Sequence, residues 1–326
     1  MTFTQRKEKT YLCRDIFFML SILIPVFNQD ATSLVVALHE QCSDLGTPKK
    51  ESSISSNWAF VEFYFEIIII DDASSDTQCK TSNRTLTSLK NVKYVELNKN
   101  IGRAAIRNVL AQAALYENLL FLDGDSGISS TDFIKNYVTW SSKNEVINGG
   151  TIYQDISKVK DDHQLHYRYG TRFESLRASQ RRKEPYLNFH SNNFLIKKKL
   201  FNQIRFDETI NTYGYEDILF GLKLKELKVE ILHIDNPVIH LGLETNDIFL
   251  EKTRHSLLNL YQLYKAGKVD STRLIDFGKK WKAWSGIIIG VDRMIRPFIE
   301  SNLRSKRANV YLFQYWKICR WLELNK

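Results

Sequence analysis

The sequence predicts an α/β protein with a mostly parallel central sheet flanked by helices, followed by a basic helical extension. Short apolar segments alternate with helical patterns up to about residue 240, and the sequence changes character near Lys252. One of the segments, Phe65–Ile70, is apolar on both faces, which is typical of a strand in the middle of a parallel sheet. Alternation of strands and helices produces such a sheet with helices on both sides.

The predicted elements follow one another in the order that this sheet requires. A continuous apolar run indicates each strand, and apolar residues three and four positions apart indicate each helix. The strands are Ser21–Phe27, Phe65–Ile70, Val92–Leu97 and Leu119–Leu122, and the helices between them include Ala31–Gln41 and Arg103–Ala114. Ligands of open α/β sheets bind beyond the carboxyl ends of the strands, so the polar residues after each run are the candidates for a site.

The composition is that of a folded protein with an uneven charge. Charged residues at 25% and aromatic residues at 12% exclude a disordered, collagen-like or low-complexity chain. The net charge is +9, but residues 252–326 hold 16 basic and 5 acidic residues, whereas residues 1–251 hold 30 basic and 32 acidic ones. A basic segment of this kind indicates a polyanionic partner, either a phospholipid surface or a nucleic acid.

We expect a protein of a reducing compartment, without a signal peptide. The four cysteines are scattered and form no C-x-x-C pair, which suits neither a disulfide framework nor a zinc site. The run Ile16–Phe27 follows basic residues, as the core of a signal peptide would, but Asp15 stands at its edge and no small-residue cleavage site follows. A buried strand is the better interpretation. No run reaches the ~20 apolar residues of a membrane-spanning helix.

Carboxylates follow two of the predicted strands. Asp71 and Asp72 come after Phe65–Ile70, where they can accept hydrogen bonds from a nucleobase and a ribose. The same turn can equally begin a helix, with a serine or an aspartate as its N-cap. Asp123 and Asp125 come after Leu119–Leu122 and can converge on Mg²⁺ or Mn²⁺. The alternative there is an ordinary polar turn around Gly124.

Two more acidic residues open a strongly periodic helix, Glu216–Leu227. A carboxylate at that position can face a pocket as a general base, or it can stabilise the helix dipole. His240 follows a short, edge-like segment, and a lone histidine is more often structural than a ligand.

Polar residues also flank the start of the predicted helix Arg103–Ala114. Asn100 and Arg107 lie where they can approach a phosphate at the helix N-terminus. No G-x-G-x-x-G follows any strand, so a dinucleotide site is not supported.

Seven segments in a fixed order resemble those of the inverting family 2 glycosyltransferases, which have the nucleotide-sugar-binding GT-A fold. The segments are SILIPVFN, IIIIDDASSD, LNKNIGRAAIRN, LLFLDGD, SNNFLIKKKLF, YGYEDILFG and NPVIHLG. They cover residues 21–242, about two-thirds of the chain, and leave the basic extension outside. Each is modest alone, and their order and spacing make the set specific. Two departures are an insert at Gly46–Asn57 and Ala73 where glycine is usual.

The resemblance implies a role for each matching residue. Asp72 matches the carboxylate that binds the nucleobase, Asp217 the catalytic base, and Glu216 a carboxylate that contacts the acceptor. The implied nucleotide-sugar site consists of Pro25, Asn28, Asp71, Asp72, Asn100, Arg107 and Asp123. The implied metal ligands are Asp123, Asp125 and His240, of which Asp125 is the closer match to the D-x-D ligand, and the metal is Mn²⁺ or Mg²⁺.

The implied activity is transfer of a hexosyl group, with inversion, from a nucleotide-diphosphate sugar to a glycan or lipid-linked acceptor. UDP is favoured by family habit, and a surface-polysaccharide pathway is the natural setting. We expect a catalytic domain at residues 1–252 and an extension at 253–326. A non-catalytic sugar-nucleotide-binding or membrane scaffolding protein is the alternative.

Two regions leave their interpretation open. Arginines between residues 163 and 198 either grip an anionic acceptor or cover a solvated helix face. In the extension, Trp and Tyr beside Lys and Arg suit a helix lying on anionic lipid, or helices packed on the catalytic domain or on another subunit. We favour lipid, with the protein in the cytoplasm and peripheral on the cytoplasmic face of a membrane. No base-reading module appears, so nucleic acid is not expected.

Overall fold

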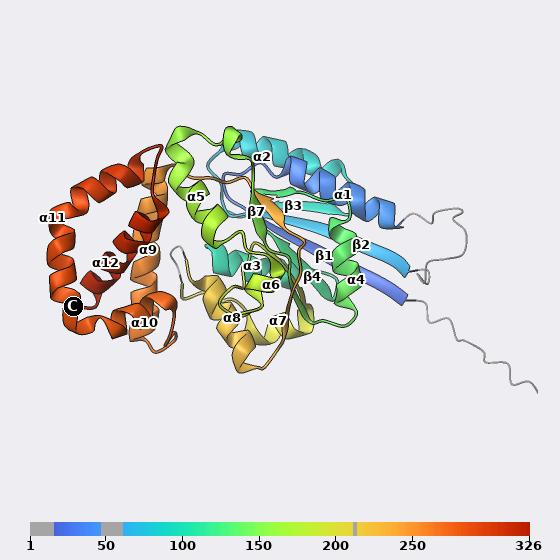
Figure 1. Cartoon of the computed structure of the whole chain (residues 1–326). Coiled ribbons are helices and arrows are strands. Elements are labelled where there is room, and N and C mark those ends of the chain that lie inside the picture. Colours follow the sequence, from blue (N-terminus) through green and yellow to red (C-terminus); the bar gives the residue numbers. More distant parts are fainter. Residues whose placement is uncertain (1–15, 47–60, 211–213) are drawn as a thin grey trace, which may run out of the picture.

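A computed structural model of the chain describes residues 16–46, 61–210 and 214–326. Its centre is a seven-stranded sheet in the order β3-β2-β1-β4-β8-β6-β9, and helices cover both faces (Figure 1). In that order the strands are Val92–Glu96, Val61–Asp71, Ile16–Val26, Asn118–Leu122, Asn193–Lys197, Val146–Asn148 and Ile231–His233. The pairs β1–β2, β1–β4, β2–β3 and β6–β9 are parallel, and β8 is antiparallel to both of its neighbours. The predicted, mostly parallel α/β sheet is confirmed.

The isoleucine run of β2 shows why the sheet is buried on both sides. Ile67 and Ile69 belong to the core under α1 (Thr32–Gly46), whereas Ile68 and Ile70 belong to the core under α3 (Arg103–Ala113). Successive strand residues point to opposite faces, so a run that is apolar throughout fits between two layers of helices. Helix α1 continues past the predicted end at Gln41, because Cys42 extends its buried stripe. The rest of the predicted insert, residues 47–57, lies outside the described residues.

A second, three-stranded sheet lies beside the carboxyl end of β4. Its order is β5 (Ser126–Ile128), β10 (Val238–His240) and β7 (Thr151–Tyr153). The segment before His240 looked edge-like in the sequence, yet β10 is the central strand of this sheet.

The other helices that precede α9 (Asn246–Lys265) connect these strands. They are α2 (Thr77–Arg84), α4 (Phe133–Ser141), α5 (Gln164–Phe173), α6 (Ala178–Arg181), α7 (Lys198–Ile204) and α8 (Glu216–Glu226), with short 3-10 turns at Thr85–Ser88, Ile156–Lys158 and Asp161–His163.

Four helices form the C-terminal end of the molecule (Figure 1). They are α9 (Asn246–Lys265), α10 (Arg273–Lys280), α11 (Ser285–Arg304) and α12 (Val310–Leu324), with a 3-10 turn at Lys282–Trp284. The expected helical extension is therefore present. The division of the chain at residue 252 stays a prediction, and α9 runs through that position.

Two apolar clusters join these helices to the part of the chain that contains the two sheets. Phe313 and Trp316 of α12 pack with Leu165 of α5, and Trp321 packs with Leu219 of α8. Leu227, the predicted last residue of this helix, instead lies just beyond the end of α8 and is about half exposed. The C-terminal helices thus pack on the part of the chain that contains the two sheets. Within the described residues, no helix combines the length and apolar character needed to cross a membrane.

Candidate active site

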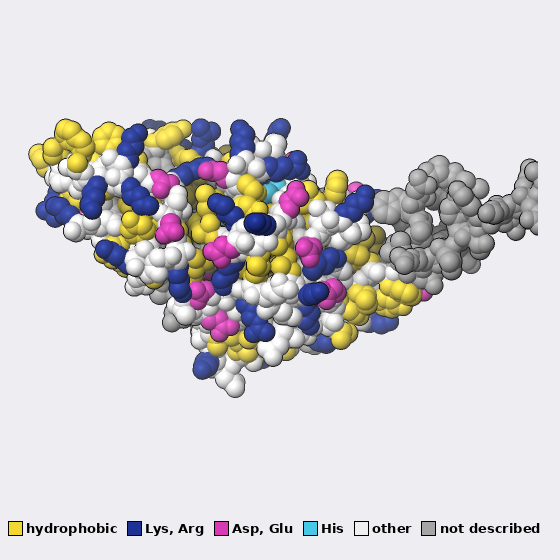
Figure 2. Space-filling view, turned by 90° about the horizontal axis from the view of Figure 1, so that it is seen from below, with side chains coloured by type: hydrophobic (Ala, Val, Ile, Leu, Met, Phe, Trp, Pro, Cys, Tyr) yellow, Lys and Arg dark blue, Asp and Glu magenta, His cyan; other side chains and the backbone are white. Residues whose placement is uncertain are grey.

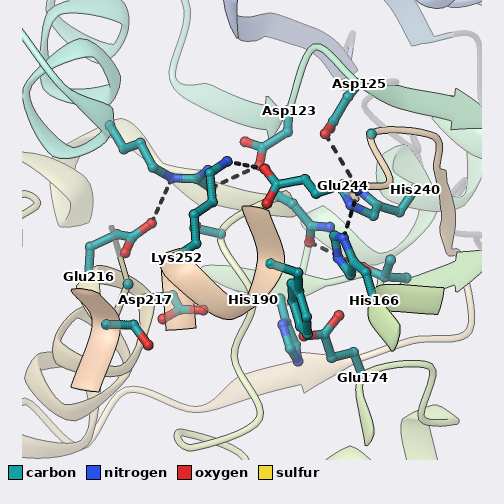
Figure 3. A pocket seen from close by; sticks show the side chains of 18 of the residues that line it. Asp123, Asp125, His166, Glu174, His190, Glu216, Asp217, His240, Glu244 and Lys252 are labelled. Carbon is teal, nitrogen blue, oxygen red and sulfur yellow. Dashed lines mark hydrogen bonds and ion pairs between the residues drawn. The ribbon is translucent and has the colours of Figure 1, made fainter. Parts of the chain in front are cut away.

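A cavity of about 660 Å³ opens at the carboxyl ends of β1, β2 and β4 and is closed on the other side by α5, α8, α9 and α12. Most of the predicted site residues, although distant in the sequence, line it together. They are Pro25, Asp72, Arg107, Asp123, Asp125, Glu216, Asp217 and His240. Asn28, Asp71 and Asn100 are not among the described residues that line the cavity. Figure 3 shows Glu216 and Asp217 across the pocket from Asp125 and His240.

The residues Asp71 and Asn28 shape the loops beneath the cavity. The Asp71 carboxylate accepts hydrogen bonds from the Ser74 N–H at 2.6 Å and from the Tyr94 hydroxyl at 2.9 Å. The Asn28 side-chain oxygen accepts from the N–H groups of Ser75 and Asp76 at 2.8 and 2.9 Å. These bonds hold the turns after β1 and β2 together. The turn also begins a helix, because Asp76 caps α2.

Asp72 combines a structural role with access to the cavity. Its two carboxylate oxygens accept hydrogen bonds from the backbone N–H groups of Ile101 and Gly102, at 2.7 and 3.0 Å. The Asn100 side chain donates to the Asp72 carbonyl at 3.1 Å, so all three contacts fix the loop before α3. A carboxylate offers about four acceptor positions, and two are left for a ligand in the cavity.

Arginines of α3 hold Asp123. The Arg107 guanidinium is buried and donates to the Asp123 carboxylate, and Arg103 donates to it at 3.2 Å. The charge of Asp123 is therefore balanced by protein cations, and Asp125 and His240 remain as the candidate metal ligands.

Asp125 and His240 form the candidate cation site. Asp125 Oδ2 lies 3.5 Å from His240 Nδ1. Burial favours neutral forms, but their mutual attraction outweighs it, lowering the pKa of Asp125 and raising the pKa of His240. Asp125 Oδ1 is buried and has no hydrogen-bond partner among the described residues. A Cβ at Gly242 would collide with this carboxylate, so the position favours glycine.

These residues fit a divalent cation that also binds a substrate. The described residues contain no group of three or more His, Cys, Asp or Glu side chains able to hold a metal. Mg²⁺ is commonly bound through one or two carboxylates together with substrate phosphates. An unpartnered carboxylate oxygen beside a histidine suits that arrangement.

The start of α8 places two adjacent carboxylates in different environments. Glu216 is buried and accepts a hydrogen bond from Arg103 at 2.9 Å. Burial opposes its ionisation, but Arg103 and Arg107 outweigh burial and lower the pKa of Glu216. Asp217 accepts a hydrogen bond from the N–H of Ile218 at 2.8 Å, and burial together with the charge of Glu216 raises the pKa of Asp217 to about 7. A carboxylate with such a pKa is suited to accept a proton near neutral pH.

Residues of α5, α9 and α12 that the sequence did not single out also line the cavity. Examples are Tyr169, Lys252, Phe313 and Lys317. The sequence does contain a signal for Lys317. This lysine lies four residues after the buried Phe313 and therefore on the same face of α12, where a cation interrupts the apolar residues.

The arginines between residues 163 and 198 lie away from the pocket. None of them is among the described lining residues. Arg181 is buried and donates to the carbonyls of Gly149 and Ile234, and Arg182 donates to the carbonyl of His233. Those two stabilise backbone, whereas His166, Glu174 and His190 of the same stretch do face the cavity.

The model of the family described as "Glycosyltransferase like family 2" matches residues 45–246, more than half of the chain. The chain belongs to this family. It is a glycosyltransferase, and its reaction is the transfer of a sugar from a nucleotide sugar. The matched region ends at the start of α9, so it contains β2 to β10 with the Asp72, Asp123, Asp217 and His240 positions. A search of curated proteins found no match to this glycosyltransferase.

Comparison with solved structures found several that are similar to this chain. The mannosyltransferase PcManGT from Pyrobaculum calidifontis, in complex with GDP-Man and Mn²⁺, has a TM-score of 0.54 and 12% identity over 92% of this chain and 85% of that one. S. aureus TarS 1-349 in complex with UDP has a TM-score of 0.47 and 18% identity over 94% of this chain and 90% of that one. Another structure of S. aureus TarS has a TM-score of 0.46 and 19% identity, and this chain spans 41% of its length. The similarity to the mannosyltransferase structure shows that this chain has the GT-A fold.

Proposed function

We propose that the glycosyltransferase moves a hexosyl group from a nucleotide-diphosphate sugar, with UDP as the nucleotide, to a hydroxyl of a glycan or lipid-linked acceptor, with inversion. The observation that carries this proposal is that Asp217 faces the Asp125–His240 pair across one cavity (Figure 3). An inverting displacement needs a base on one face of the sugar and a stabilised leaving group on the other.

The donor half of the site is at the ends of β1, β2 and β4. Asp72 retains acceptor positions for the nucleobase, and Arg103 and Arg107 bring two cations beside the place for the diphosphate. Asp125 and His240 would hold a divalent cation, which supplies a Lewis acid for the charge that develops on the leaving diphosphate. The Mn²⁺ in the mannosyltransferase structure supports this expectation.

Asp217 is the proposed general base. Its ionised carboxylate takes the proton of the acceptor hydroxyl while that oxygen forms a bond to the anomeric carbon. The bond from the anomeric carbon to the diphosphate oxygen breaks, and its electron pair leaves with the nucleoside diphosphate. General-base catalysis is typically worth ~10²–10⁴-fold in rate. Glu216, which accepts a hydrogen bond from Arg103, is the proposed acceptor-contacting carboxylate.

The test is turnover of a panel of nucleotide sugars with Mn²⁺, with Mg²⁺ and with EDTA. We expect release of nucleoside diphosphate from one donor, its loss with EDTA, and a product whose anomeric configuration by NMR is opposite to that of the donor. A product with the same anomeric configuration as the donor would contradict a single displacement with inversion. Tight nucleotide-sugar binding without turnover of any donor would identify the non-catalytic alternative.

We also propose that the protein contacts an anionic membrane peripherally, on the cytoplasmic face. One face of α11, here called the α11 face, presents Trp284, Ile287, Val291, Met294 and Phe298 at helical spacing. Met294 and Phe298 are 78% and 79% exposed. Figure 2 shows hydrophobic side chains gathered at the end of the molecule formed by the C-terminal helices, with Lys and Arg beside them.

The basic surroundings favour lipid over a second copy of the chain. Lys279, Lys280, Lys282 and Arg293 are exposed around the α11 face. A symmetric dimer through this face would bring the same cations together, whereas anionic headgroups attract them at about 1 kcal/mol each. A membrane position would suit a lipid-linked acceptor of a surface-polysaccharide pathway.

A further inference from the structure

Lys317 of α12 points into the cavity from outside the region that the family model matches. Its Nζ donates a hydrogen bond to the Tyr169 hydroxyl at 3.2 Å and lies 4.8 Å from the centre of the Tyr169 ring. The Phe313 ring, one helical turn earlier, is centred 5.5 Å from the same nitrogen. Two aromatic rings therefore hold this ammonium group at the cavity wall.

Lys317 differs from the other Lys and Arg side chains that line the cavity. Arg103 and Arg107 bind Asp123, and Lys252 binds Glu244. Over the described part of the chain, no carboxylate lies within ion-pair distance of Lys317. Burial lowers the pKa of this side chain, and the charge of Glu174 opposes that shift without forming an ion pair. An ammonium group that is partly removed from water and has no ion-pair partner is costly, so its place in a cavity favours an anionic ligand.

Lys317 lies in the acceptor half of the site, by which we mean the wall of the cavity opposite the strand ends, where α8 carries Asp217. The helix of Lys317 packs on α5 through Phe313 and Leu165. Trp321 belongs to an apolar cluster, and Tyr215, the residue two before Asp217, packs against that cluster. The donor half, in contrast, is built from the ends of β1, β2 and β4, and Arg103 and Arg107 already provide cations there. Lys317 is thus on the side of the cavity where the base meets the acceptor hydroxyl.

We infer that the acceptor carries an anionic group, a phosphate or a carboxylate, close to the hydroxyl that attacks, and that Lys317 binds this group. The inference rests on the proposed function, since it names the class of acceptor for that reaction. Lysine binds phosphate as a point charge, and Tyr169 provides a hydroxyl beside it. The aromatic rings of Tyr169 and Phe313 offer an apolar surface for the rest of the acceptor.

The test compares charged and neutral probes of matched shape. The full chain, saturated with Mn²⁺ and the nucleotide that the donor panel selects, is titrated by calorimetry with glycerol phosphate and with glycerol. A second pair, methyl glucuronide and methyl glucoside, separates carboxylate from phosphate. We expect one charged probe to bind about tenfold more tightly than its neutral partner, the usual size of a charge-assisted hydrogen bond.

Variants assign this preference to Lys317. Lys317→Gln should remove it and Lys317→Arg should keep most of it, with unchanged far-ultraviolet circular dichroism in both. Lys199→Gln, the same change at an exposed lysine of α7, is the matched control and should keep the full preference. Equal binding of charged and neutral probes by the unmodified protein, or a preference that persists in Lys317→Gln, would overturn the inference.

Kinetics then separate this inference from the proposed function. Once an acceptor is found, Lys317→Gln should raise its KM about tenfold, and the KM of the donor is measured beside it. An equal rise in both values would place Lys317 on the donor and overturn the inference. A chain that prefers the charged probe but turns over no nucleotide sugar would overturn the proposed function instead.

Discussion

Arg103 Nε donates a hydrogen bond to Glu216 Oε1 at 2.9 Å. The same guanidinium donates to Asp123 at 3.2 Å, so one side chain connects the start of α8 with the end of β4. Its charge lowers the pKa of Glu216 and opposes the rise in the pKa of Asp217. The contact thus links the donor half of the site to the proposed base.

The first prediction concerns pH. The Asp217 carboxylate is protonated below its pKa of about 7 and cannot accept a proton there. We therefore expect kcat/KM to rise as pH increases through about 7, because this ratio reports groups of the free enzyme. The neighbouring charges that set this value are Glu216, Arg103 and Arg107. A profile that is flat between pH 5 and 8 would contradict the assignment.

Removing Arg103 should move that profile. In Arg103→Met the cation that favours ionised Asp217 is absent, so the pKa rises further and the increase in kcat/KM shifts to higher pH. The shift is reduced by solvent, since the side chain is 46% exposed. Arg84 of α2 forms an ion pair with Glu96 of β3. Arg84→Met breaks this pair and is the control, for which the pH profile of kcat/KM should not move. A shift to lower pH in Arg103→Met would show that another group sets the profile.

A third prediction tests the base directly. Asp217→Asn keeps the shape of the side chain but cannot take a proton, so transfer should fall by ~10²–10⁴-fold. Nucleotide binding, measured by calorimetry, should be unchanged because Asp217 lies in the acceptor half. Asp270→Asn makes the same change on an exposed loop and should retain full turnover. Near-normal transfer by Asp217→Asn at saturating metal and substrates would mean that another residue is the base.

The turn after β2 yields a prediction about stability. Ala73 has a φ of 58°, the left-handed conformation that the usual glycine would adopt without strain. The left-handed conformation destabilises a folded protein by about 1–2 kcal/mol when the residue is alanine. Glycine avoids this strain, but it destabilises the folded state by about 0.5–1 kcal/mol because its unfolded chain has more freedom to lose. Ala73→Gly should therefore raise the free energy of unfolding by up to about 1 kcal/mol in urea titrations. Ala111→Gly, inside α3, should lower it by about 1 kcal/mol, and equal losses in both variants would refute the argument.

The fifth prediction concerns the α11 face. The full chain should sediment with vesicles containing phosphatidylglycerol, less so with pure phosphatidylcholine, and less at high salt. Met294→Ser with Phe298→Ser should weaken this binding at least tenfold, because each buried side chain of this size contributes about 1.5–3 kcal/mol. Leu115→Ser with Leu227→Ser removes two exposed leucines elsewhere and is the control. If the α11 double variant binds vesicles as well as the unmodified protein does, the lipid surface is rejected. It is also rejected if the double variant loses dimerisation while its vesicle binding is unchanged.

The sequence predicted those parts of the molecule that depend on local patterns. The β2 run is apolar on both faces and became a central strand, and Asp72, Asp123, Asp125 and Asp217 reached one cavity because they follow strands or open a helix. It could not separate Asp71 from Asp72, which have the same chemistry. Only the fold shows that Ser74 and Tyr94 donate hydrogen bonds to Asp71, whereas Asp72 lines the cavity.

The remaining features depend on tertiary packing. The pKa of Asp217 results from burial beside Glu216, and no spacing in the sequence reports burial. Lys317 is 100 residues beyond Asp217, and only the packing of α12 on α5 and α8 brings it to the cavity.

Trp321 and Leu219 belong to one apolar cluster, so the C-terminal helices support the helix that carries Asp217. They also form one wall of the cavity, while the nucleotide half is built without them. Grafting α9–α12 from another family member would therefore alter which hydroxyl is glycosylated and leave the choice of sugar donor as it was. In this architecture, the two substrates can diversify separately.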